Sequence, residues 1–295
     1  MATTLSHEWE PDRAGRVLFL LALVALLLHG VYATATHRGL YGDASWFLLR
    51  ILSENKVTNF YSDFSREFYY SRFVAYHLTQ LPTVLAQAAG MSDPSHLSWV
   101  LNATYFSHKL LSLVLCYLLL PVGKKLFVVF PILGIFAGSM VSEIYIVTET
   151  HLAASVFWPI IIAICFSPVL HKLRFALLAG AILLSAFVYE SFAFLGVFWL
   201  GFAVLRAVRT PSRGQKAAWL LIAAACLVPI MVSWAAILFP RDPTNKSAFT
   251  GGLLRLLSDT RSGIPSMHVA ATMAIVAIAA LMPLLLSRRF RKSSA

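Results

Sequence analysis

Charged side chains are scarce in this sequence. Only 13% of the 295 residues are Asp, Glu, Lys or Arg, whereas 59% are hydrophobic. This is too little polar surface to cover a soluble protein of this size, which excludes a water-soluble globular fold. Several apolar stretches instead approach the length of about 20 residues that crosses the hydrocarbon core of a bilayer. The composition therefore predicts an all-α, polytopic transmembrane helix bundle.

Cysteine is also rare, and the three cysteines, Cys116, Cys165 and Cys226, all fall within apolar runs. A thiol in such a place packs as a small hydrophobic side chain, so no disulfide framework or metal-binding spacing is expected. A removable signal peptide is not evident either, because the first apolar segment, residues 17–32, follows a tail of mixed charge and lacks a small-residue cleavage site. We expect this segment to be retained as the first span.

Acidic residues are missing from four connectors between the apolar segments. These connectors are rich in Lys and Arg and lie at residues 123–125, 171–174, 206–216 and 287–292. The apolar segments predict about eight spans, at residues 17–32, 97–120, 126–141, 152–166, 175–188, 192–205, 217–239 and 269–286. With these spans, all four basic connectors fall on the side of the amino terminus, which the positive-inside rule assigns to the cytoplasm.

The net charge of +11 follows from this topology, so no nucleic-acid partner is expected. We expect one integral membrane domain over residues 1–295, multi-pass in the plasma (inner) membrane, with both termini in the cytoplasm. Its parts are a cytoplasmic tail at residues 1–16, a long outer loop at residues 33–96 and a second outer loop at residues 240–265.

The long outer loop is not a featureless linker. Helical patterns at residues 44–52 and 72–89 are typical of amphipathic helices that lie in the membrane interface. Residues 175–205 would form about 46 Å of helix, which is long for one span and short for two. A helical hairpin that turns at Tyr189-Glu190-Ser191 keeps both flanking basic connectors on one side, so we favour two spans.

The sequence Tyr41-Gly42-Asp43-Ala44-Ser45 follows the first span and precedes this loop. The order of a first span, an outer loop with two amphipathic helices and a bundle resembles the GT-C glycosyltransferases over the amino-terminal two thirds of the chain. In that superfamily an acidic residue after the first span is the catalytic base, and the donor is usually a polyprenyl-phosphate sugar. The resemblance implies that Asp43 is the base and that the partners are membrane lipids and a polyprenyl-phosphate-linked sugar. Ala44 stands where the superfamily often has a second carboxylate.

The chemistry gives Asp43 a role that does not depend on the resemblance. An acceptor hydroxyl must lose its proton as it attacks the anomeric carbon of the sugar, and a positioned carboxylate can take that proton. The alternative is structural, because an aspartate after Gly42 also suits the cap of a helix over residues 44–52. Both interpretations remain open on the sequence.

A second polar group, Glu143, Glu149 and His151, lies on the connector before residue 152, on the same outer side as Asp43. In the resembling superfamily this loop contributes acidic residues near the donor phosphate and metal. Glu149 and His151 could bind a divalent cation or orient an acceptor, although two residues do not define a metal site. The alternative is a hydrated loop that exposes its charges.

Cations on the outer side are candidates for holding a phosphate, and Arg72, Arg241 and Arg255 are the ones that we select. Arginine can bind phosphate oxygens through two parallel hydrogen bonds, although anchoring to lipid headgroups explains any one of them equally well. Lys109 differs because it lies in the middle of a predicted span with Asn102 nearby. An unpaired charge there is costly, so we expect Lys109 to face a polar cavity.

Residues Pro265, Ser266 and His268 form a competing motif, which resembles the Pro-Ser-x-His element of the PAP2 family of lipid phosphatases and phosphotransferases. The resemblance implies that Ser266 binds phosphate and that His268 protonates the leaving group. The family also needs a downstream histidine as nucleophile, and no histidine follows His268. Pro265 and Ser266 alternatively only start a helix. A third possibility is a non-catalytic transporter or assembly subunit.

The first prediction concerns topology. Single cysteines introduced at Lys125, His171 or Ser212, in a background without the natural cysteines, should be shielded from a membrane-impermeant reagent in intact cells. Cysteines at Asn59 or Asn245 should be labelled. Labelling at Ser212 from outside would reverse the orientation and place the predicted site in the cytoplasm.

Overall fold

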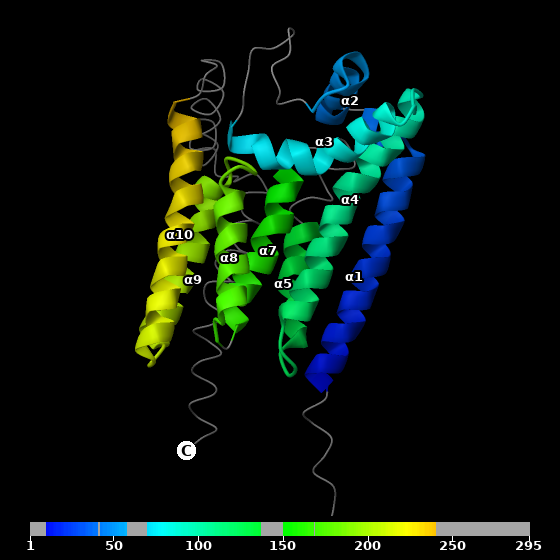
Figure 1. The fold of residues 1–295 in the computed structure, drawn as a ribbon. Coiled ribbons are helices and arrows are strands. Elements are labelled where there is room, and N and C mark those ends of the chain that lie inside the picture. The colour runs from blue at the N-terminus through cyan, green and yellow to red at the C-terminus, as the bar shows by residue number, and fades with distance from the viewer. Residues whose placement is uncertain (1–9, 41, 58–69, 137–149, 168, 240–295) are drawn as a thin grey trace, which may run out of the picture. The chain divides into compact units, whose positions relative to one another are not determined.

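The computed structural model describes residues 10–40, 42–57, 70–136, 150–167 and 169–239 (Figure 1). Every regular element in these residues is helical, which confirms the all-α prediction for them. The elements are α1 (Glu10–Ala35), η1 (Arg38–Leu40), α2 (Gly42–Glu54), η2 (Tyr70–Arg72), α3 (Phe73–Ala88), α4 (Pro94–Leu119), η3 (Lys125–Val128), α5 (Val129–Ile135), α7 (Thr150–Phe166), α8 (Lys172–Ser185), α9 (Phe192–Arg209) and α10 (Arg213–Leu238). All contacts described below lie within residues 1–236, which form one compact unit.

Three helices of the described residues are long and apolar enough to cross a membrane. They are Asp12–Ala35, Phe192–Arg209 and Arg213–Leu238. Helices α7 and α8 have 17 and 14 residues and are shorter than a straight crossing requires. Helix α4 has 26 residues but carries polar side chains along its length. Eight crossings therefore remain a prediction, and the segment at residues 269–286 lies outside the described residues.

The start of α1 contacts the connector that follows α4. The carboxylate of Asp12 accepts hydrogen bonds from the backbone N–H groups of Gly123 and Lys125, at 2.7 and 3.1 Å. The ring of Phe127 in η3 lies 5.1 Å from the ring of Phe166, the last residue of α7. The start of α1, the ends of α4 and α7, and the basic connector at residues 123–125 therefore lie at one end of the unit.

The other two described basic connectors lie at the same end. Just after α7, the carbonyl of Ser167 accepts a hydrogen bond from Arg206 near the end of α9. The backbone N–H of Leu170 donates to the side chain of Gln215 in α10, at 2.9 Å. We call this the basic end of the unit. Its cations on these three connectors are Lys124, Lys125, Lys172, Arg174, Arg206, Arg209, Arg213 and Lys216.

Helices α2 and α3 occupy the other end, where α1 finishes and α4 begins. Figure 1 shows α3 running transverse to the long helices. Its start is tied to the turn after α8, because the N–H of Val74 donates to the carbonyl of Phe187 at 2.8 Å. Near its end, Gln87 donates to the carbonyl of Leu52 at the end of α2, at 3.2 Å. We call this the α3 end; the two helices confirm the helical patterns predicted for the outer loop.

The segment at residues 175–205 forms two helices rather than one. Helix α8 ends at Ser185 and α9 begins at Phe192, with turns between them that contain Glu190. The hydroxyl of Ser233 in α10 donates to the carbonyl of Tyr189 at 3.4 Å, so the far end of α10 lies beside this turn. The predicted helical hairpin is therefore present.

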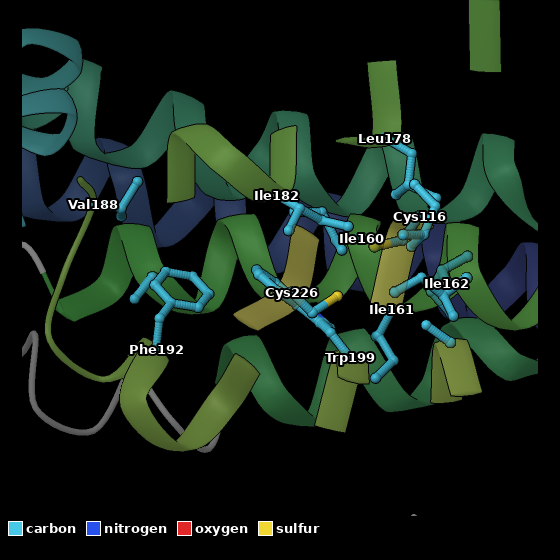
Figure 2. Close-up of a cluster of buried hydrophobic side chains, with 14 of the residues drawn as sticks. Cys116, Ile160, Ile161, Ile162, Leu178, Ile182, Val188, Phe192, Trp199 and Cys226 are labelled. Carbon is cyan, nitrogen blue, oxygen red and sulfur yellow. The ribbon is translucent and has the colours of Figure 1, made fainter. Parts of the chain in front are cut away.

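An apolar core joins the long helices (Figure 2). Trp199 of α9 is fully buried, and its ring stacks on the ring of Phe157 in α7 at 5.8 Å between centroids. The thiols of Cys116 and Cys226 lie in the same core without forming a disulfide. These two cysteines pack as small hydrophobic side chains, as predicted.

Close packing of α1 on η3 yields the second prediction. A Cβ atom added at Gly15 would lie 2.4 Å from the backbone carbonyl carbon of Lys125, and backbone cannot move aside cheaply. Gly15→Ala should therefore destabilise the protein by about 1–3 kcal/mol, seen as a lower thermal unfolding midpoint in detergent. Gly201→Ala is the matched control: a Cβ there meets nothing within 4 Å, and alanine favours a helix by up to about 1 kcal/mol. Equal changes of the unfolding midpoint in the two variants would contradict the close contact between Gly15 and Lys125.

Candidate functional site

Six of the residues selected from the sequence lie outside the described residues. These are Glu143, Glu149, Arg241, Arg255, Ser266 and His268. Their predicted roles, including metal binding and the phosphatase motif, remain predictions. Asp43, Arg72, Lys109 and His151 fall on described helices or turns.

Asp43 is the second residue of α2, at the α3 end. In the capping alternative it would precede the helix, but α2 begins at Gly42. An acidic residue in the first turn is also stabilised by the helix dipole, so a structural role still competes with catalysis. The next residue, Ala44, is fully buried and packs in one cluster with Leu101 and Tyr105 of α4. The first turn of α2 is thereby fixed against α4.

Helix α4 carries a row of buried polar residues on one side, which we call the polar stripe. Its members are Ser98, Asn102, Lys109 and Ser112, which are at most 3% exposed and repeat at a spacing that keeps them on one side of the helix. The amide of Asn102 donates to the carbonyl of Ala33 at the end of α1, at 3.3 Å. The ammonium of Lys109 lies 4.7 Å from the centre of the Phe106 ring. That Lys109 faces a polar cavity stays a prediction.

His151 lies in the first turn of α7 and is only 4% exposed. The alternative of a hydrated loop is therefore wrong for this residue. The charge of Lys109 acts on His151 and on His29 of α1, so groups from three helices come within electrostatic range of one another. Within the described residues, no group of three or more His, Cys, Asp or Glu is placed to hold a metal ion.

Arg72 binds a carboxylate in this structure. Its Nε lies 3.0 and 3.1 Å from the two oxygens of Glu190, and the hydroxyl of Ser71 donates to the same carboxylate at 2.6 Å. The guanidinium also lies 4.7 Å from the centre of the Tyr189 ring. These contacts tie the start of α3 to the α8–α9 turn. A phosphate that bound Arg72 would have to share the guanidinium with Glu190. The sequence did not indicate the pairing of Arg72 with Glu190.

Helix α3 turns its polar face inward. Thr79, Gln80 and Thr83 are fully buried, whereas Leu78, Leu81 and Leu85 are 45%, 41% and 59% exposed. The buried face packs on α4 and α2, its neighbours in the unit. Sequence reasoning missed the three polar residues, because an amphipathic pattern shows two faces but does not tell which one meets the protein.

His108 has a structural role at the crossing of α3 and α4. Pro82 lacks a backbone N–H, so the carbonyl of Leu78 loses its usual donor within α3. The Nε2 atom of His108 lies 3.2 Å from that carbonyl and replaces the missing donor. Lys109 of the polar stripe is the next residue of α4. We call the buried polar residues Thr79, Gln80 and Thr83 of α3, Asn102 and Lys109 of α4, and His151 of α7 the polar cluster.

The chain matches no protein-family model, no curated protein and no solved structure.

The third prediction tests the link between α3 and the α8–α9 turn. Glu190→Gln should lower the free energy of unfolding by about 1–3 kcal/mol, because hydrogen bonds to a charged group are lost, measured by unfolding in mild detergent. Glu54→Gln is the matched control at the same end, since Glu54 lies 3.8 Å from Arg50, beyond hydrogen-bonding distance. Its effect should stay below about 0.5 kcal/mol. Similar losses of unfolding free energy in both variants would contradict the role of Glu190 in linking α3 to the α8–α9 turn.

Proposed function

We propose that this protein is a membrane glycosyltransferase that transfers a sugar from a polyprenyl-phosphate donor to an acceptor at the non-cytoplasmic face of the membrane. The observation that carries the proposal is the placement of Asp43. It lies in the first turn of α2, shortly after α1 ends, at the end of the unit opposite the basic connectors.

The polar cluster supports the same assignment. Buried polar groups in an apolar helical bundle are costly and are kept mainly where a pathway or site needs them. The first turn of α2 packs on α4 through Ala44 and Tyr105, and Lys109 lies one helical turn further along α4. A base and a cation for the donor phosphate would then come from adjacent turns of neighbouring helices.

The proposed reaction needs one base and one group that receives the leaving phosphate. The acceptor hydroxyl gives its proton to the carboxylate of Asp43 while its oxygen forms a bond to the anomeric carbon. The bond between that carbon and the phosphate oxygen breaks, and the electron pair leaves with the polyprenyl phosphate. Lys109, His151 and the outer arginines would stabilise the negative charge that develops on this oxygen.

The charge distribution supports the orientation that the reaction requires. Three basic connectors gather at the basic end, and the positive-inside rule favours the cytoplasm for such loops. The α3 end then faces away from the cytoplasm in the plasma (inner) membrane, and about eight spans complete the topology. In this orientation, Asp43 would lie at the outer face, where a lipid-linked sugar is presented.

The fourth prediction separates this proposal from the PAP2-like alternative. Asp43→Asn should lower sugar transfer from a polyprenyl-phosphate donor by at least about 100-fold, because a general base is lost, whereas His268→Ala should change it little. Asp93→Asn is the matched control, since Asp93 caps α4 at the same end and asparagine also caps helices. Activity is measured with membranes that contain each variant. Full transfer by Asp43→Asn, or phosphate release that depends on His268, would overturn the proposal.

A further inference from the structure

Positive charge is concentrated at the basic end, on the connectors that join α7 to α8 and α9 to α10. We call the six cations there the connector cations: Lys172, Arg174, Arg206, Arg209, Arg213 and Lys216. No Asp or Glu occurs at residues 150–189 or 191–241, which contain all four helices. None of the six makes an ion pair in the part of the chain that the structure describes. An anion that balances this charge therefore comes from outside these helices.

Hydrogen bonds hold the two connectors together. The side chain of Gln215 in α10 accepts from the backbone N–H of Leu170 at 2.9 Å and donates to the carbonyl of the same residue at 3.3 Å. The guanidinium of Arg206, near the end of α9, donates to the carbonyl of Ser167. Lys172 follows Leu170 by two residues and is exposed. The starts of α8 and α10 are therefore neighbours, and cations of both connectors border one surface.

Four of the connector cations lie where their own helices disfavour them. Lys172 and Arg174 are in the first turn of α8, and Arg213 and Lys216 are in the first turn of α10. The first turn of a helix carries partial positive charge, so a cation there is destabilising and an anion is stabilising. The positive-inside rule explains basic connectors, but it does not require the cations to lie in first turns. An anion bound beside both helix starts would offset the repulsion.

This surface lies at the ends of two helices, α9 and α10, that are long and apolar enough to cross a membrane. Arg206 and Arg209 are in the last turn of α9, and Arg213 begins α10. The ends of such helices lie at the depth of the lipid headgroups. Leu173 in the first turn of α8 and Val208 in the last turn of α9 are 71% and 70% exposed. Exposed aliphatic side chains thus adjoin the exposed cations.

We propose that this surface binds the headgroup of an anionic phospholipid. The phosphate lies beside the starts of α8 and α10, where Lys172 and Lys216 attract it, and the acyl chains lie against Leu173 and Val208. A soluble acidic ligand would match the charge but would leave these aliphatic side chains in water, whereas a lipid suits both. With the basic end in the cytoplasm, the lipid belongs to the cytoplasmic leaflet, whose anionic headgroups attract basic segments. The inference does not depend on sugar transfer, because Asp43 lies at the α3 end.

Titration of the full chain in neutral detergent with phosphatidylglycerol, followed by native mass spectrometry, tests the site. The natural chain should bind phosphatidylglycerol more tightly than phosphatidylcholine. The double variant Lys172→Gln, Lys216→Gln should weaken phosphatidylglycerol binding by about 10-fold or more, since each cation near an anionic headgroup contributes about 5-fold. Lys172→Arg with Lys216→Arg should keep the affinity, because the charges remain. Unchanged binding by the double glutamine variant would overturn the proposal.

Arg13→Gln with Arg16→Gln is the matched control. These two exposed cations lie near the start of α1 at the same end of the unit, and Figure 1 shows the starts of α1 and α10 on opposite sides of it. The control removes the same charge and should keep phosphatidylglycerol binding within about 2-fold, because salt screens exposed charges that do not contact the headgroup. Equal losses in the two double variants would show that net charge alone attracts the lipid and would overturn the site.

Two further measurements distinguish the lipid from other anions. Glycerol phosphate carries the phosphate without acyl chains, so it should not displace phosphatidylglycerol when the two are at equal concentration. Displacement would assign the surface to a soluble phosphate compound and overturn the lipid. A polyglutamate peptide is the second competitor. If it binds in a manner that depends on Lys172 and Lys216 and excludes phosphatidylglycerol, the surface binds an acidic protein segment and the proposal falls.

Discussion

Burial of the polar stripe on α4 is the constraint on which the described structure depends. Ser98, Asn102, Lys109 and Ser112 run along a helix in an otherwise apolar bundle, where each unsatisfied polar group costs several kcal/mol. Helix α1 provides the carbonyl of Ala33, and α7 packs on another part of α4. Helix α3 crosses it at His108. The positions of these three helices all follow from the need to cover α4.

Helix α3 buries Thr79, Gln80 and Thr83 and exposes Leu78, Leu81 and Leu85. Its leucine face would be an error in a soluble protein, and Pro82 would weaken a helix that had to stand alone. Here His108 replaces the donor that proline lacks.

The two ends of the unit differ in the contacts that their charged side chains make. At the basic end, Asp12 and Arg206 hydrogen-bond to backbone groups of the connectors, at Gly123 and Ser167. At the α3 end, charged groups are built into contacts between distant segments, such as Arg72 with Glu190. Glu190 at the α3 end therefore organises the fold.

The sequence by itself determined the helices of the described residues, the break near Glu190 and the gathering of basic connectors, because apolar periodicity and charge are local properties. It also indicated Asp43, since the end of a first span is visible in hydropathy. It did not reveal that Arg72 pairs with a residue 118 positions away, or that His151 is buried. Above all, it did not show that Thr83 faces inward and Leu81 outward. Periodicity gives a helix two faces, but only its tertiary neighbours decide which face meets protein and which meets lipid.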